Sequence, residues 1–348
     1  MKNVVTVVGT RPNFIKSALL SEEYKKNSVQ ETIIHTGQHY DVELSENIFN
    51  DLNLRNPDIN LGINSGSQAF QTGKMIIELE KHLLKIKPKL ITIFGDTNST
   101  LAAAICASKL DIPFVHIEAG ERTLINGMQE EENRIICDQL ASLNCCATKL
   151  AVSNLKHEKI HGKVVFTGDL MLDLFLRKIK EANSPSVYLP KEFVLLTIHR
   201  AENTNNQTRF KQIIKTLGKL NTTIVWPMHQ RAKKYLSIYA IDLPKNFITI
   251  APVSYTQMIW LESNCYRVIT DSGGVQKEAY WSGTPCINLL PKTAWTQTLE
   301  GQWNQLIGDD VEKITHAFKI KPKGKPYMKH FGDGHAAFKI YQSINDFL

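Results

Sequence analysis

A glycine-containing turn in the second half of the sequence has residues that could bind a phosphate group. Asp271, Ser272, Gly273 and Gly274 stand between the apolar run YRVIT and the helical pattern QKEAYWS. Backbone N–H groups at the start of a helix attract anions, so this turn could hold a diphosphate. Glu278, one helical turn later, could accept hydrogen bonds from the hydroxyls of a ribose. A structural alternative stays open, in which Ser272 only caps the helix and Glu278 faces solvent.

A second tight turn, GTRP at residues 9–12, leads from the first apolar run into a helical pattern. Arg11 and Lys16 could supply positive charge for a diphosphate, because Arg and Lys are the usual partners of phosphate oxygens. The dinucleotide pattern GxGxxG and the Walker pattern GxxxxGK[ST] are both missing here, which argues against nicotinamide cofactors and phosphoryl transfer from ATP. Lys16 could equally be an exposed helix lysine.

Three carboxylates in the first half could move protons. Asp96 and Glu118 follow apolar runs, and Glu130 opens the acidic run at residues 130–132. Carboxylates that share a site shift one another's pKa values and can divide acid and base roles. Two of them also have a simpler interpretation: Asp96 could cap the helix that begins with TNST, and Glu130 could lie in solvent at a helix start.

Two histidines, His199 and His229, follow apolar runs of the second half and could bind a phosphate or transfer a proton. A histidine at the end of a strand can also make an ordinary structural hydrogen bond.

The six cysteines form no CxxC pair, and no histidine stands at zinc-finger spacing from them. We therefore expect neither a metal nor a cofactor.

Composition bounds the class of protein. The chain has 348 residues, enough for two domains at about 150 residues each. Its net charge of +7, from 41 Lys and Arg against 34 Asp and Glu, fits a small anionic ligand at least as well as nucleic acid. The sequence has no apolar run of about 18 residues and no leader-peptide pattern, and its cysteines suit a reducing compartment. We expect a soluble cytoplasmic protein that binds a small molecule and neither nucleic acid nor membrane.

Short β-branched runs alternate with helical patterns, which is typical of parallel strands joined by crossover helices. The runs predict strands at 4–8, 32–35, 90–94, 114–117, 150–152 and 164–166, then at 193–198, 223–226, 247–250, 268–270 and 286–290. A polar segment, 183–186, separates the two sets. We predict an α/β protein of two Rossmann-like, doubly wound domains that face a central cleft, with the polar residues above at the carboxyl ends of the strands.

Eight motifs resemble one family when they are taken in order. They are VGTRPNFIK, HTGQHYD, GDTNST, HIEAGERT, EENR, HRAEN, TDSGGVQKEA and FGDGHA, and they span essentially the whole chain. In this order they resemble the non-hydrolysing UDP-N-acetylglucosamine 2-epimerases. The resemblance implies a GT-B, glycogen-phosphorylase-like fold, a homodimer, and a final helix from near Gly334 that returns to the first domain. It divides the chain into residues 1–168 with 334–348, and residues 169–333.

The resemblance also implies roles for the residues above. The carboxylates would carry the chemistry, the cations and a histidine would contact the diphosphate, and the turn before Glu278 would hold UDP. The candidate residues are thus Asp96, Glu118, Glu130 and His199 for catalysis, and Arg11, Lys16, Arg134, His229, Ser272, Gly273, Gly274 and Glu278 for substrate binding.

The implied reaction inverts C2 of a UDP-2-acetamido sugar. A C2 hydrogen has no carbonyl beside it and is too weakly acidic for direct removal. Departure of UDP leaves a developing cation at C1, and loss of the C2 proton then gives a 2-acetamidoglucal. Protonation from the other face and re-addition of UDP complete the inversion. The family implies conversion of UDP-GlcNAc to UDP-ManNAc for bacterial surface polysaccharides, with no redox cofactor or metal.

Two departures from the family pattern bear on the substrate and on regulation. Residues 292–297 read KTAWTQ where UDP-N-acetylglucosamine enzymes usually show TERPE, and this form resembles the branch that acts on UDP-2,3-diacetamido-2,3-dideoxyglucuronic acid. Gln38 and His39 match a regulatory site of some bacterial members, but the Arg expected near residues 67–69 is missing, so we predict no strong activator dependence. A GT-B glycosyltransferase and a non-catalytic nucleotide-sugar-binding protein are the more distant alternatives.

Overall fold

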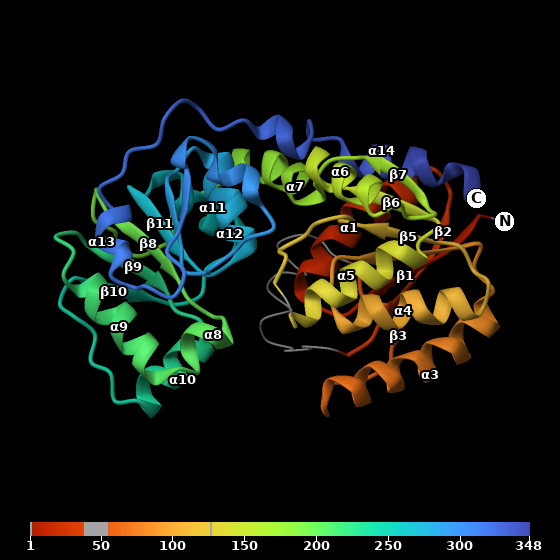
Figure 1. Cartoon of the computed structure of the whole chain (residues 1–348), viewed down its shortest axis with the longest axis horizontal. Coiled ribbons are helices and arrows are strands. Elements are labelled where there is room, and N and C mark those ends of the chain that lie inside the picture. The colour runs from red at the N-terminus through yellow and green to blue at the C-terminus, as the bar shows by residue number, and fades with distance from the viewer. Residues whose placement is uncertain (1, 38–54, 126) are drawn as a thin grey trace. The chain divides into compact units, whose positions relative to one another are not determined.

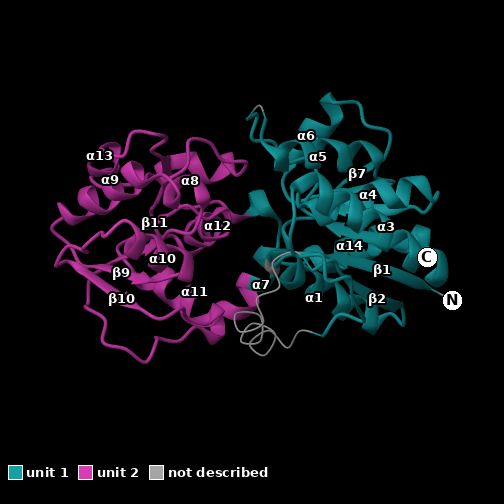
Figure 2. Ribbon diagram, turned by 90° about the horizontal axis from the view of Figure 1, so that it is seen from below, with its two compact units in different colours: residues 1–174, 329–348 teal, residues 175–328 magenta. Residues whose placement is uncertain are grey.

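The computed structural model describes residues 2–37, 55–125 and 127–348, and for Arg11 the backbone alone. The chain divides into two compact units (Figure 2). The first consists of Met1–Leu174 and Lys329–Leu348, and the second of Phe175–Met328. Helix α7 (Leu170–Lys178) carries the chain out of the first unit into the second. Each unit has a parallel sheet of its own.

The first unit is built on a seven-stranded parallel sheet (Figure 1). Its strand order is β3-β2-β1-β4-β5-β6-β7, so the chain moves outward from β1 in one direction and from β4 in the other, which is the doubly wound arrangement. Every residue of β4 and β5 is buried, as expected for strands covered on both faces. The strands are β1 (Asn3–Val8), β2 (Gln30–His35), β3 (Ile59–Asn60), β4 (Leu90–Phe94), β5 (Phe114–Ile117), β6 (Leu143–Cys146) and β7 (Lys163–Phe166).

Helices cover this sheet on its two faces. Helices α3, α4 and α5 are neighbours in one layer, and α1 packs against the last helix, α14. The helices of this unit are α1 (Arg11–Lys26), α3 (Gln68–Ile86), α4 (Asn98–Lys109), α5 (Gln129–Leu140), α6 (Lys149–His157) and α14 (Ala336–Ile344). Among the described residues, no helix has the length and the apolar character that a membrane span requires.

The final segment is fastened to the first unit by a close backbone contact. Gly332, with φ +109°, lies so near Gly168 that a Cβ on Gly332 would come within 2.9 Å of the Gly168 Cα. Only glycine accepts both this backbone conformation and this approach. Beside it, the N–H of Asp169 donates to the carbonyl of Phe331 at 2.8 Å. The FGDGHA motif therefore fixes the chain just before α14.

The second unit has a six-stranded parallel sheet in the order β10-β9-β8-β11-β12-β13. Its strands are β8 (Val194–Thr197), β9 (Ile224–Pro227), β10 (Phe247–Ile250), β11 (Arg267–Thr270), β12 (Cys286–Asn288) and β13 (Asn304–Leu306). Its helices are α8 (Ala201–Thr204), α9 (Gln207–Gly218), α10 (Gln230–Ile238), α11 (Tyr255–Asn264), α12 (Gly273–Ser282) and α13 (Lys313–Ala317).

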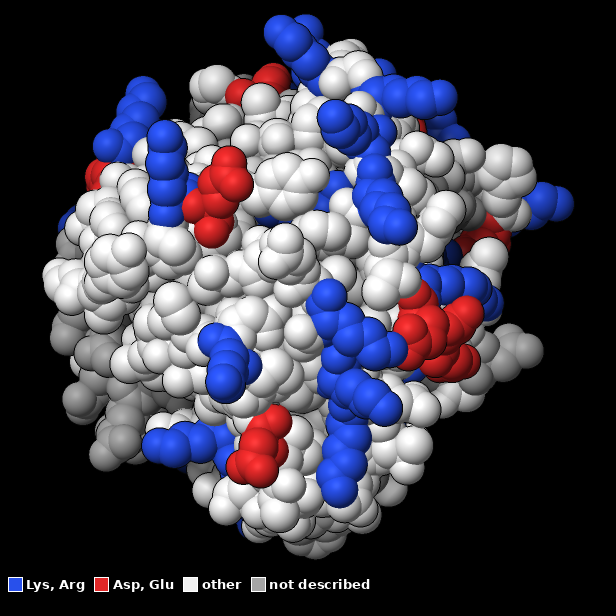
Figure 3. All heavy atoms as spheres, turned by 90° about the vertical axis from the view of Figure 1, so that its left-hand side faces the viewer, with Lys and Arg blue, Asp and Glu red and all other residues white. Residues whose placement is uncertain are grey.

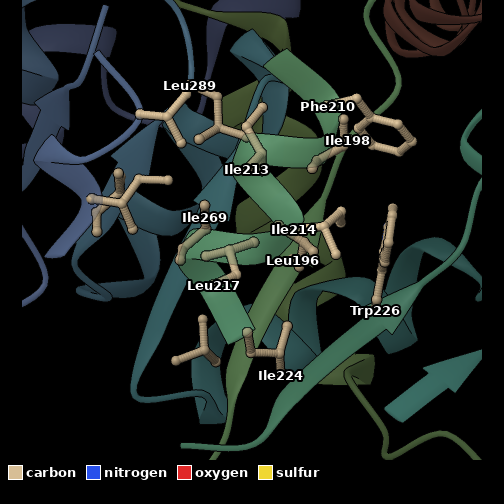
Figure 4. Packing of buried hydrophobic residues seen from close by; sticks show 14 of the residues in the cluster. Leu196, Ile198, Phe210, Ile213, Ile214, Leu217, Ile224, Trp226, Ile269 and Leu289 are labelled. Carbon is tan, nitrogen blue, oxygen red and sulfur yellow. The ribbon is translucent and has the colours of Figure 1, made fainter. Parts of the chain in front are cut away.

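An apolar core holds the central strands of this unit in place (Figure 4). Leu196 of β8 and Ile269 of β11 pack with Ile213 and Leu217, which are four residues apart on one face of α9. All four side chains are fully buried, and each contributes about 1.5–3 kcal/mol by leaving water. This packing fixes the carboxyl ends of β8 and β11, where His199 and the turn before α12 follow.

The prediction of two doubly wound parallel sheets is confirmed. The predicted strand at 150–152 is wrong, because these residues lie in α6. Thr148 starts that helix by accepting a hydrogen bond from the N–H of Ala151 at 3.1 Å. The strand lies one segment earlier, at β6, where a buried Asn144 interrupts the apolar run and its side chain donates to the carbonyl of Asp138 at 3.1 Å.

Candidate active site

Asp96 and Glu118 lie at the carboxyl ends of two neighbouring strands of the first sheet. Asp96 follows β4 after Gly95, and Glu118 directly follows β5. Both turns use the left-handed backbone region, with φ +65° at Gly95 and +68° at Glu118. A Cβ on Gly95 would lie 3.9 Å from Oε1 of Glu118 and from Nζ of Lys16. A left-handed φ is uncommon for a residue with a side chain, and such residues gather at functional sites.

Two cations of the first unit bind these carboxylates. Nζ of Lys16, on α1, lies 2.5 Å from Oε2 of Glu118. Arg134, on α5, pairs with Asp96 and, at 3.0 Å, with Glu131. The side chains of Lys16 and Arg134 are only 8% and 12% exposed, so these pairs are stronger than ion pairs on an open surface. Burial alone would lower the pKa of Arg134, but the surrounding carboxylates outweigh it and the pKa is raised. The structure therefore brings four of the predicted residues together.

The acidic run at the start of α5 presents Glu131 to this cluster. Glu131 is buried and accepts hydrogen bonds from the N–H groups of Thr123 at 2.9 Å and Leu124 at 3.0 Å. Burial would raise the pKa of Glu131, but these hydrogen bonds and Arg134 hold it below its usual value. Glu130 is exposed, and no hydrogen bond between described residues joins it to the cluster. Its catalytic role stays a prediction. The sequence analysis missed Glu131, although its spacing of three residues from Arg134 was a usable signal.

The turn before α1 is fixed by close packing. A Cβ on Gly9 would come within 1.9 Å of Oγ of Ser99, so only glycine fits there. Asn13 donates a hydrogen bond to the carbonyl of Phe94 at 3.1 Å, which ties α1 to the end of β4. The side chain of Arg11 lies outside the described residues, so its contact with a diphosphate stays a prediction.

In the second unit, Asp271 joins the end of β11 to the end of β8. Its carboxylate is fully buried and accepts hydrogen bonds from the N–H groups of His199 at 3.1 Å and Arg200 at 3.0 Å and from the side chain of Asn203 at 3.0 Å. Burial would raise the pKa of Asp271, but these donors and the His199 ring hold it below its usual value. Nδ1 of His199 is 3.2 Å from the same carboxylate, and the His199 and His229 ring centroids are 6.1 Å apart. Asp271 thus orients His199, whose side chain is 43% exposed.

Helix α12 begins at the turn predicted to bind a phosphate. Ser272 caps the helix, since its Oγ accepts a hydrogen bond from the N–H of Val275 at 3.4 Å. Glu278 is 5% exposed, and its Oε1 accepts a hydrogen bond from the hydroxyl of Tyr255 at 2.7 Å. The alternative in which Glu278 faces solvent is therefore wrong. A capped helix start still presents backbone N–H groups to an anion. The four predicted UDP-binding residues, Ser272, Gly273, Gly274 and Glu278, lie in and directly before one helix.

Comparison with known proteins identifies the family. The family model described as UDP-N-acetylglucosamine 2-epimerase matches residues 22–345. The chain belongs to the UDP-N-acetylglucosamine 2-epimerase family. The prediction of an epimerase-type isomerase is therefore confirmed.

Relatives match this family member over nearly its whole length. A UDP-N-acetylglucosamine 2-epimerase homolog of Methanococcus maripaludis is 40% identical over 99% of each chain. The UDP-2,3-diacetamido-2,3-dideoxy-D-glucuronate 2-epimerase of Pseudomonas aeruginosa is 37% identical over 98% of this chain and 99% of its own. The crystal structure of the Methanocaldococcus jannaschii UDP-GlcNAc 2-epimerase, in complex with UDP-GlcNAc and UDP, matches with a TM-score of 0.90 at 36% identity and covers 99% of each chain. The predicted fold class of two Rossmann-like domains, GT-B-like, is confirmed.

The segment that departs from the usual family pattern lies against the start of α12. A Cβ on Gly273 would be 3.4 Å from Nε1 of Trp295. Nζ of Lys277 lies 3.8 Å from the ring centroid of Trp295, at cation–π distance, and both side chains are buried. Trp295 therefore forms part of the surroundings of the phosphate-binding turn. The sequence analysis singled out this segment because it differs from the usual family motif. It missed Lys277 of α12 and Tyr255 of α11, because only the packing of these helices shows that both side chains are buried beside the turn.

The positive charge of this epimerase is concentrated in the second unit. Residues 175–328 carry 21 of the 41 Lys and Arg but only 11 of the 34 Asp and Glu. On the face shown in Figure 3, blue basic side chains accordingly cover more of the surface than red acidic ones. Because the same unit carries the turn before α12, its field attracts an anionic ligand toward that unit.

The expectation of no metal wrongly assumed that the sequence has no His-Glu-x-x-His spacing, because HEKIH at 157–161 has it. In the structure, however, α6 ends at His157 and Lys159 has φ +53°. The two histidines therefore do not share a helical face, and Glu158 instead pairs with Arg122. Gln38 and His39, on which the regulatory prediction rests, lie outside the described residues.

Proposed function

We propose that this family member catalyses C2 epimerisation of a UDP-2-acetamido sugar, of the UDP-GlcNAc to UDP-ManNAc type. The observation that supports this most is the pairing of two strand-end carboxylates with their own cations, Glu118 with Lys16 and Asp96 with Arg134. Moving protons on two faces of C2 requires carboxylates, and expelling a diphosphate requires cations. A protein that only binds a nucleotide sugar has no use for such a set.

The proposed reaction balances without a redox step. The C1–O bond breaks, and its electron pair leaves with UDP. A carboxylate removes the C2 proton, which gives the 2-acetamidoglucal. A proton then adds to C2 on the opposite face, and a UDP oxygen bonds to C1 again. We assign proton transfer to Asp96, Glu118 and Glu130, with His199 as the further catalytic residue at the diphosphate, and charge stabilisation to Arg11, Lys16 and Arg134.

The ion pair with Lys16 gives Glu118 the charge state that a base needs. A cation within hydrogen-bond distance favours the ionised form of a carboxylate. Lys16 therefore favours an ionised Glu118, and Arg134 pairs with Asp96. When the diphosphate departs, the same cations can share their hydrogen bonds with it, because an ammonium has three donors and a guanidinium five.

The second unit supplies the proposed UDP site. Backbone N–H groups at Gly273 and Gly274, with the Ser272 hydroxyl, would bind the phosphates. Glu278 would accept hydrogen bonds from the ribose hydroxyls, and Tyr255 fixes the orientation of its carboxylate by the 2.7 Å hydrogen bond. His229 would make a further phosphate contact, since its ring lies beside that of His199.

UDP-2,3-diacetamido-2,3-dideoxyglucuronic acid is the second candidate substrate. Two observations favour it: the KTAWTQ segment, whose Trp295 lies next to Gly273, and the 37% identity to the Pseudomonas aeruginosa enzyme of that name. The 40% identity to the Methanococcus maripaludis relative keeps UDP-N-acetylglucosamine as the first candidate.

Incubation in deuterated water tests both reaction and substrate. An epimerase exchanges the sugar H2 for deuterium and forms the C2 epimer without any acceptor, whereas a glycosyltransferase does neither. We expect H2 exchange with UDP-N-acetylglucosamine or with UDP-2,3-diacetamido-2,3-dideoxyglucuronic acid. NMR of the recovered sugar measures the loss of the H2 signal and the appearance of the C2 epimer. Absence of exchange with both would overturn the proposal.

We also propose that the enzyme works in the cytoplasm and supplies precursors for bacterial surface polysaccharides. All six cysteines are buried free thiols, which suits a reducing compartment. Burial raises the pKa of the Cys106 thiol to about 11, which keeps it unreactive. A strain that lacks the gene should make no surface polysaccharide of this kind. Return of the polysaccharide when the gene is supplied again would support this role.

We propose a homodimer that pairs through α3. Phe70, Ile77 and Leu84 are spaced seven residues apart on this helix, and each is more than half exposed. A seven-residue repeat of apolar side chains forms one continuous stripe, which can pack against the same stripe of a second copy. The family resemblance implies the same oligomeric state.

A further inference from the structure

A buried histidine lies between the two turns that carry Asp96 and Glu118. His116 belongs to β5, and its side chain has no exposed surface. Its Nδ1 lies 2.7 Å from Oδ1 of Asp138, on α5, and its Nε2 lies 2.7 Å from the carbonyl oxygen of Gly95. The sequence analysis gave His116 no role, because inside an apolar run it has the position of an ordinary core residue.

Both partners of the ring are acceptors. A backbone carbonyl has no proton to donate. Asp138 also accepts a hydrogen bond from the N–H of Gly120 at 3.1 Å and pairs with Arg122 at 2.7 Å, so it is held as a carboxylate. Burial would raise the pKa of Asp138, but His116 and Arg122 outweigh it and hold the pKa below its usual value. Both ring nitrogens of His116 must therefore donate, which requires the imidazolium form.

We propose that His116, donating from both ring nitrogens, is a positioning residue that fixes the turns carrying Asp96 and Glu118. Its Nε2–H holds the carbonyl of Gly95, the residue directly before Asp96. Through Asp138 it also holds the N–H of Gly120, two residues after Glu118. One buried network thus fixes both strand-end turns.

The backbone of these turns explains why such a network is needed. Gly95, Glu118 and Gly120 have φ values of +65°, +68° and +79°. Of the three, Glu118 has a side chain that disfavours the left-handed region, and strained residues of this kind persist only where their surroundings hold them in place. Glu118 itself is held by a hydrogen bond from its N–H to the carbonyl of Cys145 at 3.0 Å.

The charges of the network balance, which makes a buried imidazolium tolerable. Arg122 pairs with Glu158, at the end of α6, through hydrogen bonds of 2.8 and 2.7 Å as well as with Asp138. Two cations, His116 and Arg122, therefore face two anions, Asp138 and Glu158. Other titratable groups also lie near the network. Glu121 is a buried carboxylate that accepts a hydrogen bond from the hydroxyl of Thr148 at 3.0 Å, and Asp96 pairs with Arg134. The thiols of Cys137, Cys145 and Cys146 stay neutral, because burial raises the pKa of each. A fully paired buried network resists protonation changes and rigidifies its surroundings.

NMR of the imidazole nitrogens tests the charge directly, and it needs no substrate. Protein with ¹⁵N-labelled histidine should show a proton on both nitrogens of His116 at neutral pH. The His116→Gln variant assigns the signal. In Asp138→Asn the amide no longer offsets the charge, so one nitrogen should lose its proton. A His116 ring with one unprotonated nitrogen in the wild-type protein at neutral pH would overturn the proposal.

Kinetics test the positioning role, which rests on the proposed epimerase function. In His116→Gln we expect kcat for H2 exchange to fall about 100-fold, the effect of a small displacement of catalytic groups. The Kd for UDP should change less than about threefold, because the proposed phosphate and ribose contacts at Ser272, Gly273, Gly274 and Glu278 belong to the second unit, whereas His116 belongs to the first. His157→Gln, an exposed histidine on α6, is the matched control and should behave as wild type.

The outcomes separate the two proposals. If wild-type protein exchanges no H2, the proposed function fails while the NMR result still decides the charge of His116. If His116→Gln keeps wild-type kcat, or loses kcat and UDP affinity in the same proportion as folded protein, His116 is not a positioning residue.

Discussion

Nζ of Lys16 lies 2.5 Å from Oε2 of Glu118, so a cation predicted for the diphosphate is bound to a predicted catalytic carboxylate. Arg134 makes the corresponding pair with Asp96. Each of these cations is thus ion-paired with a predicted catalytic carboxylate. Replacing the cation should therefore alter proton transfer by its carboxylate as well as the binding of the diphosphate.

Lys16→Met should therefore change the pH dependence of the reaction. Without the ammonium, the Glu118 carboxylate is easier to protonate, so the acid limb of the kcat profile for H2 exchange should move to higher pH. At neutral pH we expect kcat to fall by about 10- to 100-fold, the usual contribution of one charged group to catalysis. Exchange rates followed by NMR from pH 5 to about 9 give the profile.

The control for this change is Lys25→Met, an exposed lysine on the same helix. It should leave the profile unchanged. A Lys16→Met enzyme with a higher KM but an unshifted profile would show that Lys16 contacts only the substrate and does not act on Glu118.

Two adjacent carboxylates of α5 should give opposite results. Glu131→Gln removes a buried acceptor of the N–H groups of Thr123 and Leu124, so thermal unfolding should show a loss of about 1.5–3 kcal/mol. Glu130→Gln changes an exposed side chain and should leave the midpoint unchanged, but abolish H2 exchange if Glu130 transfers the proton. Normal exchange in Glu130→Gln, with exchange lost in folded Glu131→Gln, would move that role to Glu131.

Gly273→Ala should separate UDP binding from folding. Gly273 has an ordinary helical backbone, and a Cβ would meet only Trp295, at 3.4 Å, so the fold should accept alanine. The added methyl group would stand where the phosphates are expected, and we expect UDP affinity to fall about 10-fold or more, equivalent to about 1.4 kcal/mol. Calorimetric titration with UDP measures this, beside a thermal midpoint within about 2 °C of wild type. Unchanged UDP affinity would place the phosphates elsewhere.

The proposed dimer predicts a specific change in mass. Replacing Phe70, Ile77 and Leu84 by serine should convert the dimer to a monomer, measured by sedimentation equilibrium, without unfolding, because all three side chains are exposed in the single chain. Ile238→Ser, at an exposed isoleucine of the second unit, is the control and should leave the mass unchanged. A wild-type monomer at micromolar concentration would contradict the proposal.

The sequence permits the sheets and the strand-end residues to be predicted, because both follow from local patterns. Apolar runs located β4 and β5, and the parallel-sheet rule placed Asp96 and Glu118 at one edge. The error at 150–152 arose because an amphipathic helix that starts at Thr148 has a short apolar run of its own. The pairing of Glu131 with Arg134 could have been predicted from their spacing of three residues, but its hydrogen bonds to the loop at Thr123 could not, because they depend on how that loop packs against α5.

Glu262 provides a test of stability against pH. This residue of α11 has no exposed surface, and among the described residues neither of its carboxyl oxygens has a hydrogen-bond partner. Burial, together with the nearby Glu278, raises the pKa of Glu262 well above its ordinary value of 4.5. Between about pH 4.5 and the raised pKa, Glu262 of the unfolded chain releases its proton while Glu262 of the folded protein keeps it. The unfolded state then binds fewer protons, so the free energy of unfolding falls as pH rises, by at most about 1.4 kcal/mol per pH unit from this group.

Glu262→Gln keeps the shape of the side chain and removes the titration. The free energy of unfolding of this variant, measured with urea at several pH values from about 5 to 8, should therefore exceed that of wild type by a margin that grows with pH. Glu192→Gln, an exposed glutamate of the same unit, is the control and should run parallel to wild type. If Glu262→Gln also runs parallel to wild type, the buried carboxyl is already ionised in the folded protein. That result would contradict the raised pKa of Glu262, and the negative charges of Glu262 and Glu278, which is hydrogen-bonded by Tyr255, would then lie close together in the folded protein.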